Sequence, residues 1–154
     1  MTTTSTDRIE KQVLIHAPRS RVWQAITDYK QFGEWFRVEL EGPFEAGMPA
    51  RGKVTYPGYE DMKWEMVVDR IDAEHLFSFR WHPYGIDPGV DYSSEPMTLI
   101  VFELEEVADG TLLRLTESGF DQIPLERRAK AFEMNSMGWA EQMKNIERYV
   151  AKVA

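Results

Sequence analysis

The sequence contains no cysteine among its 154 residues, which excludes disulfide bridges and thiolate-ligated metal sites. Its three histidines, His16, His75 and His82, show neither helical pair spacing nor an HExxH grouping, so we expect no metal site. It also lacks a nucleophile elbow, a P-loop and a G-x-G-x-x-G turn, so no catalytic set and no cofactor are predicted. No apolar run approaches the roughly 18 to 20 residues that a membrane-spanning helix needs.

Positive charge is scarce. The chain has 18 Lys and Arg against 26 Asp and Glu, a net charge of −8, so nucleic acid and anionic membranes are not expected partners. The close basic cluster of Arg127, Arg128 and Lys130 is expected on the solvent side of a helix start. The absence of cysteine and of a hydrophobic leader segment suits a cytoplasmic location.

The length fits one domain that can bury a core without covalent cross-links. Residues 1–7 are polar and are expected to form a disordered tail, and residues 8–154 are expected to form a single domain. Both a monomer and a homodimer stay open.

A long amphipathic helix is predicted from Pro124 to the C-terminus. Its apolar or small residues recur at alternating intervals of four and three, which places them on one helix face. They are Leu125, Ala129, Phe132, Ser136, Trp139, Met143, Ile146, Val150 and Val153. Such a face must be buried, and Gly138 beside Trp139 either lets the helix pack closely or leaves room for another group.

Strands are predicted before this helix. Residues 9–15, 64–68, 77–81, 97–107 and 111–118 read as strands, and apolar side chains alternate most clearly at Trp64, Met66, Phe79 and Trp81. Asp109-Gly110 is a strong hairpin signal. Two short helices follow the first strand, the second with Asp28 and Gln31 at capping-box spacing. The loop over residues 82–96 is unusually long and reads either as a lid or as a harmless insertion.

This order of elements predicts an α+β helix-grip fold. A curved antiparallel sheet of about seven strands would wrap around the long C-terminal helix, because neither could otherwise bury its apolar face. A cavity between sheet and helix would be a natural binding site.

Several motifs resemble one known family. Residues 17–27 (Ala17-Pro18, Val22-Trp23, Ala25-Ile26-Thr27) with Trp35-Phe36 resemble the start of START-like domains of the SRPBCC superfamily. The closer resemblance is to homologues of the activator of the heat-shock protein 90 ATPase. It is carried by Gly42-Pro43-Phe44 with Gly47, the strand Phe77-Ser78-Phe79-Arg80-Trp81, Glu117-Ser118-Gly119-Phe120, and Gly138-Trp139 with Ile146 and Tyr149.

The resemblance covers residues 9–150 and implies the helix-grip fold. It implies no single chemistry, since this scaffold carries many ligands and few shared reactions. The N-terminal domain with which the eukaryotic co-chaperone stimulates its partner's ATPase is not expected in this sequence.

One acidic residue stands out from the many on solvent-facing positions. Glu117 shares strand parity with Leu113 and Leu115, so it faces inward if they do. An inward carboxylate would have a raised pKa unless paired, and could act as an acid or base. The alternative is a structural partner for a nearby hydroxyl or for Arg114.

Aromatic and methionine side chains are the main candidates for a ligand site. The predicted pocket lining comprises Trp35, Phe36, Trp64, Met66, Phe79, Trp81, His82, Glu117, Met134, Trp139 and Met143. Flat rings and adaptable methionine suit a hydrophobic or aromatic ligand. The same residues could equally fill the core, and both interpretations stay open.

Three functions follow. The favoured one is a small-molecule binding module without catalytic residues, holding a hydrophobic or aromatic ligand between sheet and helix. The first alternative is a protein-interaction role with a chaperone partner, as in the co-chaperones. The second is an enzyme on an aromatic or polyketide-like substrate, using Glu117, His82 or Tyr84. Whether the chain is an enzyme is left open, with the non-catalytic reading preferred.

Overall fold

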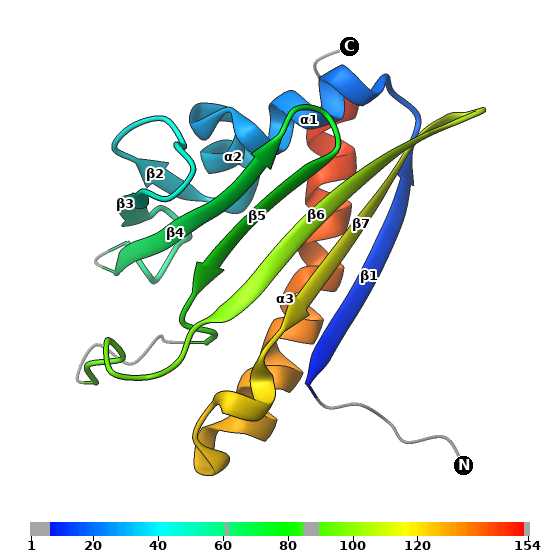
Figure 1. The fold of residues 1–154 in the computed structure, drawn as a ribbon. Helices are drawn as coiled ribbons and strands as arrows, with labels where there is room; N and C mark the ends of the chain where they lie inside the picture. The colour runs from blue at the N-terminus through cyan, green and yellow to red at the C-terminus, as the bar shows by residue number, and fades with distance from the viewer. Residues whose placement is uncertain (1–6, 61, 85–89, 153–154) are drawn as a thin grey trace, which may run out of the picture.

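The computed structural model describes residues 7–60, 62–84 and 90–152 (Figure 1). The elements, in chain order, are β1 (Arg8–Ile15), α1 (Arg19–Thr27), α2 (Tyr29–Phe36), β2 (Val38–Leu40), β3 (Pro49–Val54), β4 (Lys63–Asp72), β5 (Leu76–Trp81), β6 (Thr98–Val107), β7 (Gly110–Ser118), the short 3₁₀ helix η1 (Phe120–Gln122) and α3 (Leu125–Lys152). The predicted tail lies outside the described residues except for Asp7, and so do residues 85–89 of the long loop.

The seven strands form one antiparallel sheet in the order β1-β7-β6-β5-β4-β3-β2. The sheet curves around α3, while α1 and α2 cover the end of the sheet that lies beside the C-terminal turns of α3 (Figure 1). The predicted α+β helix-grip fold is therefore confirmed, including the two short helices after the first strand. No helix in the described part of the chain combines the length and hydrophobicity that a membrane crossing requires.

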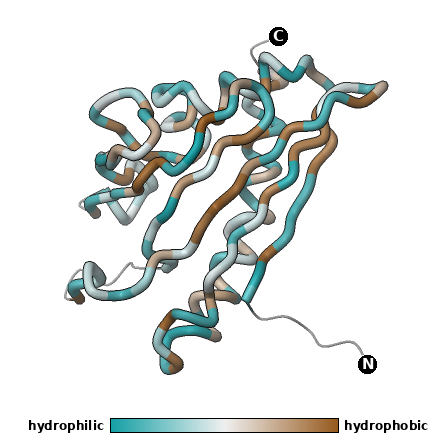
Figure 2. Tube along the Cα trace, in the orientation of Figure 1, coloured by the Kyte–Doolittle hydropathy of each residue, from teal (hydrophilic) through white to brown (hydrophobic). Residues whose placement is uncertain are grey.

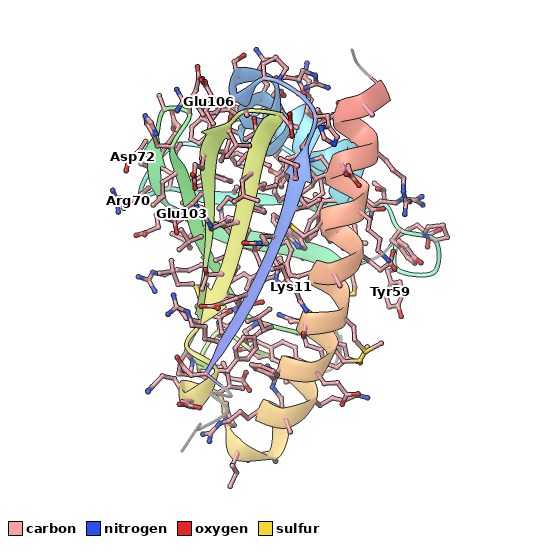
Figure 3. All side chains as sticks on the ribbon, turned by 90° about the vertical axis from the view of Figure 1, so that its right-hand side faces the viewer. Lys11, Tyr59, Arg70, Asp72, Glu103 and Glu106 are labelled. Carbon is pink, nitrogen blue, oxygen red and sulfur yellow. The ribbon has the colours of Figure 1, made fainter. Side chains whose placement is uncertain are left out.

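Sequence patterning explains the sheet's two faces. Ile9 and Ile15 of β1 are buried between exposed neighbours, and Leu113 and Leu115 of β7 are fully buried beside them. The longest hydrophobic stretch lies on β6, an interior strand between β7 and β5 (Figure 2). Seen from the side, the labelled charged residues Arg70 and Glu103 lie on the face opposite α3 (Figure 3). The inner face and the helix stripe thus bury each other.

The prediction of a buried helix stripe is wrong for the first turns of α3. Leu125 is 76% exposed and Ala129 is exposed, whereas Ala131 is fully buried. The reason is visible in Figure 1, where the first turns of α3 project past the end of the sheet. From Trp139 to Val150 the stripe is buried as predicted.

The capping prediction for α2 is half correct. The Asp28 side chain accepts hydrogen bonds from the backbone N–H groups of Lys30 (2.9 Å) and Gln31 (3.3 Å), as an N-cap does. The Gln31 side chain does not return to Asp28. It accepts a hydrogen bond from Arg21 of α1 instead (2.9 Å), which ties the two short helices together.

Candidate functional site

Glu117, near the end of β7, is a fully buried carboxylate surrounded by hydrogen-bond donors. Its Oε2 accepts from Thr98 Oγ1 (2.6 Å) and Trp81 Nε1 (2.8 Å), and its Oε1 accepts from Trp139 Nε1 (2.8 Å). Asn135 Nδ2 donates to both oxygens, at 3.0 and 3.1 Å. Four donors from β5, β6 and α3 therefore meet on one carboxylate of β7.

Burial raises the pKa of the Glu117 carboxyl, and the hydrogen bonds from Thr98, Trp81, Trp139 and Asn135 oppose that rise. The inward orientation predicted from strand parity is correct. The hydroxyl partner is Thr98, but Arg114 is not a partner, because it lies on the outer face and pairs with Glu105. Glu117 thus holds the sheet and the helix together through neutral donors.

The two indoles that donate to Glu117 are stacked on each other. The ring centroids of Trp81 and Trp139 are 5.5 Å apart with an interplanar angle of 25°. Phe36 of α2 lies against both, at 5.8 Å from Trp81 and 6.3 Å from Trp139. Because each indole N–H is held by the same carboxylate, the rings form an ordered aromatic wall.

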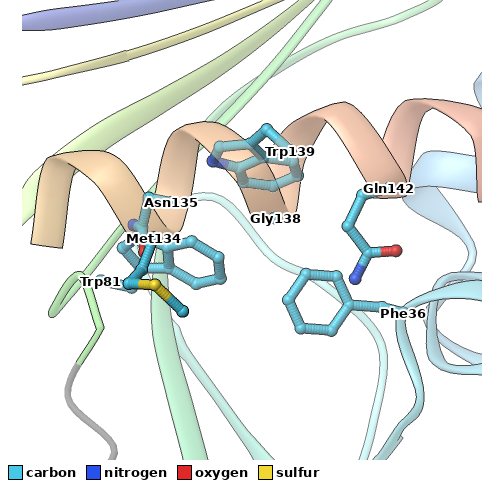
Figure 4. A pocket seen from close by; sticks show the side chains of 7 residues that line it. All are labelled: Phe36, Trp81, Met134, Asn135, Gly138, Trp139 and Gln142. Carbon is cyan, nitrogen blue, oxygen red and sulfur yellow. The ribbon is translucent and has the colours of Figure 1, made fainter.

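A pocket opens in front of this wall, which we call the indole pocket (Figure 4). Its volume is about 120 Å³, and it is lined by Phe36, Trp81, Met134, Asn135, Gly138, Trp139 and Gln142. Gly138 is exposed, and a Cβ added there would meet no atom within 4 Å. Of the two roles considered for Gly138, the structure favours leaving room over close helix packing.

A second pocket of about 330 Å³ adjoins the first. Its described lining residues are Phe36, Met62, Lys63, Trp64, Glu65, Trp81, His82, Tyr84, Tyr92 and Asn135. Phe36, Trp81 and Asn135 line both pockets, so the two pockets are neighbours along these side chains, and together we call them the hollow. The first part is mainly aromatic, and the second adds charged and phenolic side chains.

The predicted lining residues divide into two groups. Phe36, Trp64, Trp81, His82, Met134 and Trp139 line one or both pockets. The others pack in the core without lining either pocket: Trp35, Met66, Phe79, Glu117 and Met143. The set is therefore divided between pocket lining and core, because the inner layer fills the sheet's concavity and the outer layer reaches its mouth.

Sequence reasoning missed the two amides of the indole pocket, Asn135 and Gln142. With Gly138 they form a second stripe on α3 at intervals of three and four, each one residue before a member of the apolar stripe. Of the three, Gly138 is the residue that a helix interior disfavours, by about 1 kcal/mol relative to alanine. That pattern was the available signal.

Arg127 does not lie on the solvent side of the helix start, contrary to the prediction. Its guanidinium binds the carboxylate of Glu95 (2.8 Å) and the backbone carbonyls of Pro83 (3.0 Å) and Tyr84 (3.2 Å). It also lies over the ring of Tyr92, 4.8 Å from its centroid. Arg127 thus fixes both described ends of the long loop beside the second pocket.

Two of the histidines have hydrogen-bond partners on the backbone. Within the described residues no group of three or more His, Asp or Glu side chains is arranged to hold a metal ion. His82 bonds the carbonyl of Glu95 through Nε2 (3.1 Å), and His16 bonds that of Asp109 through Nδ1 (3.0 Å). The two histidines are thus each bonded to a backbone carbonyl.

The sequence model of the family described as Activator of Hsp90 ATPase homolog 1-like protein matches residues 16–151. No curated protein matches the chain.

Several solved structures share its architecture, the SRPBCC fold. Protein MLL2253 from Mesorhizobium loti is 19% identical with a TM-score of 0.75, over 96% of this chain and 98% of its own. DynU16, a protein of the dynemicin biosynthetic locus, is 24% identical with a TM-score of 0.71, over 94% of this chain and 47% of its own. CalU16 from Micromonospora echinospora is 19% identical with a TM-score of 0.60, over 93% of this chain and 74% of its own. These likenesses show the fold.

Proposed function

The chain belongs to the Activator of Hsp90 ATPase homolog 1-like protein family, and we propose that it is a non-catalytic binding module for a small aromatic or hydrophobic molecule held in the indole pocket. The observation that carries the proposal is the hollow itself. Stacked indoles form its wall, and Gly138 leaves the helix side open. Flat aromatic walls with a flexible methionine suit an aromatic guest.

The volume agrees with such a guest. An apolar cavity of about 150 Å³ can bind benzene, so the indole pocket at about 120 Å³ accommodates one ring with part of it exposed. A larger molecule would extend into the second pocket, which shares Phe36, Trp81 and Asn135. The ligand class is therefore a single ring or a ring with an extension.

Binding is favoured over catalysis by the state of Glu117. It is the buried carboxylate nearest the hollow, yet it lines neither pocket and both its oxygens already accept hydrogen bonds. A general acid or base must reach the proton that it transfers. Glu117 serves the pocket by holding its walls.

One of the similar structures supports a role with small molecules. DynU16 comes from the dynemicin biosynthetic locus, which places one protein of this fold beside the chemistry of a small molecule. The family description alone does not carry an interaction with a chaperone to this chain.

The test uses Gly138 as a site that can be filled. Calorimetric titration with para-ethylanisole, an aromatic probe without a hydrogen-bond donor, should show binding to the wild type and about equally to Gly138→Ala. Gly138→Leu has a similar helix propensity to the alanine variant but places an isobutyl group in the open space, so its affinity should fall at least about tenfold. Equal affinity of the leucine and alanine variants, or no binding of any aromatic probe to the wild type, would contradict the proposal.

A further inference from the structure

The two amides of the indole pocket are turned in opposite directions by hydrogen bonds behind them, Asn135 by the Glu117 carboxylate and Gln142 by the Asn145 amide. Asn135 lies at one side of the pocket with Trp81 and Met134, and Gln142 lies at the other with Phe36 (Figure 4). They are seven residues apart on α3, about two helical turns or roughly 10 Å along its axis. Their orientations decide which hydrogen bonds a ligand can make.

Asn135 is oriented by Glu117. Its Nδ2 donates to both carboxylate oxygens, at 3.0 and 3.1 Å. A carboxylate only accepts, so the opposite orientation of the amide would set two acceptors against each other. The oxygen Oδ1 therefore faces away from Glu117, and among the described residues none donates to it. Asn135 offers the pocket a hydrogen-bond acceptor.

Gln142 is oriented through a chain of side chains on α3. The guanidinium of Arg148, which only donates, gives a hydrogen bond to Asn145 Oδ1 (3.4 Å). Asn145 is thereby set to donate through Nδ2 to Gln142 Oε1 (2.9 Å). The nitrogen of Gln142 is turned toward Phe36 (Figure 4), and no acceptor for it exists in the part of the chain that the structure describes. Gln142 offers the pocket a hydrogen-bond donor.

From this arrangement we propose that the pocket selects an aromatic ring that carries a hydrogen-bond donor on one side and an acceptor on the other, as in a hydroxyaryl ketone. The inference rests on the proposed binding function and names its ligand class. The ligand's donor, a phenol O–H or an N–H, bonds to Asn135 Oδ1, and its acceptor, a carbonyl, bonds to Gln142 Nε2. Asn135 and Gln142 are thus the residues that determine specificity.

The same arrangement disfavours an anionic group at the Asn135 side. An aromatic carboxylate there would face an amide oxygen with the Glu117 carboxylate directly behind it. At the Gln142 side the nearest charged group in the chain of hydrogen bonds is the Arg148 cation. The two ends of the pocket along α3 therefore differ: the Asn135 end favours a hydrogen-bond donor, and the Gln142 end favours an acceptor.

Four para-disubstituted benzenes of similar shape test the inference by calorimetric titration. Para-hydroxyacetophenone has the donor and the acceptor, para-ethylphenol only the donor, para-methoxyacetophenone only the acceptor, and para-ethylanisole has no donor and only a weak ether acceptor. Each matched hydrogen bond should strengthen binding about three- to tenfold, so para-hydroxyacetophenone binds tightest and para-ethylanisole weakest.

Two variants assign the contacts. Asn135→Leu should abolish the preference for para-ethylphenol over para-ethylanisole and keep the preference for para-methoxyacetophenone. Gln142→Leu should do the reverse. Both comparisons are made within one variant, so a general loss of affinity does not affect them, and binding of para-ethylanisole shows that the pocket is intact.

The outcomes separate the two proposals. If all four probes bind the wild type with similar affinity, the pocket binds aromatic rings but the inference about its polarity is wrong. If each variant loses both preferences or neither, the assignment of the donor and the acceptor is wrong. If no probe binds the wild type, the proposed function itself fails, and the inference with it.

Discussion

Replacing Glu117 by glutamine tests whether its carboxylate holds the two indoles. The substitution keeps the size of the side chain but turns one accepting oxygen into an NH₂ donor. Of the four donors around it, only the Thr98 hydroxyl can turn round and accept, since indole N–H groups only donate and Asn135 would have to turn its amide. At best the new NH₂ lies at the position of Oε2, where it leaves Trp81 Nε1 without an acceptor.

A buried donor without a partner costs about 1 to 3 kcal/mol. We therefore expect Glu117→Gln to lower the free energy of unfolding by about that amount at neutral pH, measured by urea denaturation. The matched control is Glu105→Gln, which removes an exposed pair with Arg114 and should cost no more than about 0.5 kcal/mol. Equal stability of the two variants would refute the view that the carboxylate is needed as an acceptor.

The contribution of Glu117 to the free energy of unfolding should change with pH in a definite direction. Burial raises the pKa of Glu117 above its ordinary value of 4.5, so the folded protein binds this proton more tightly than the unfolded chain does. The stability that the proton contributes is present below that ordinary value and is lost as the pH rises through the raised pKa. The difference in unfolding free energy between the wild type and Glu117→Gln should therefore narrow as the pH rises from about 4.5. A difference that widens would contradict the raised pKa.

Three further predictions concern single side chains. Gly138→Ala should stabilise the protein by about 0.5 to 1 kcal/mol in urea denaturation, because alanine favours the helix and its Cβ meets nothing within 4 Å; a loss of stability would show that the space is not open. Arg127→Lys should lower the free energy of unfolding by about 1 to 3 kcal/mol, because lysine cannot keep the forked contact with Glu95 together with the two carbonyl bonds. The control Arg114→Lys, at an exposed pair, should change that free energy by no more than about 0.5 kcal/mol. Equal effects of the two variants would refute the anchoring role of Arg127. Burial and the neighbouring Glu34 raise the pKa of Tyr149 from its ordinary value of 10.0 to about 12. As the pH rises from 10.0 to about 12, the wild type should therefore lose more stability than Tyr149→Phe. An ultraviolet titration in which this phenol ionises at its ordinary value would disprove the shift.

Much of the fold could be predicted because its signals are local. The hairpin at Asp109-Gly110 joins β6 to β7, and period-two alternation placed Phe77 and Phe79 on the inner face. Strand parity alone predicted that Glu117 points inward. Each of these features depends on residues a few positions apart, where turn geometry and strand alternation act directly.

The site was harder to predict because its contacts join distant residues. Arg127 was expected in solvent because its partner Glu95 lies 32 positions earlier and is brought to it only by the fold. The roles of Asn135 and Gln142 depend on which way each amide is turned, and that is decided by Glu117 on another element and by Arg148 through Asn145. Residue types show that an amide is present, but its orientation is a property of the assembled network.

The central claim is that a small aromatic molecule binds against the paired indoles of Trp81 and Trp139. The most direct measurement is a proton–nitrogen NMR titration of the indole N–H resonances with para-hydroxyacetophenone. The resonances of Trp81 and Trp139 should shift and saturate together, while that of Trp35, buried and donating to the carbonyl of Ala25 (2.8 Å), should stay in place. Unchanged Trp81 and Trp139 resonances at saturating probe, or equal shifts at Trp35, would contradict the account.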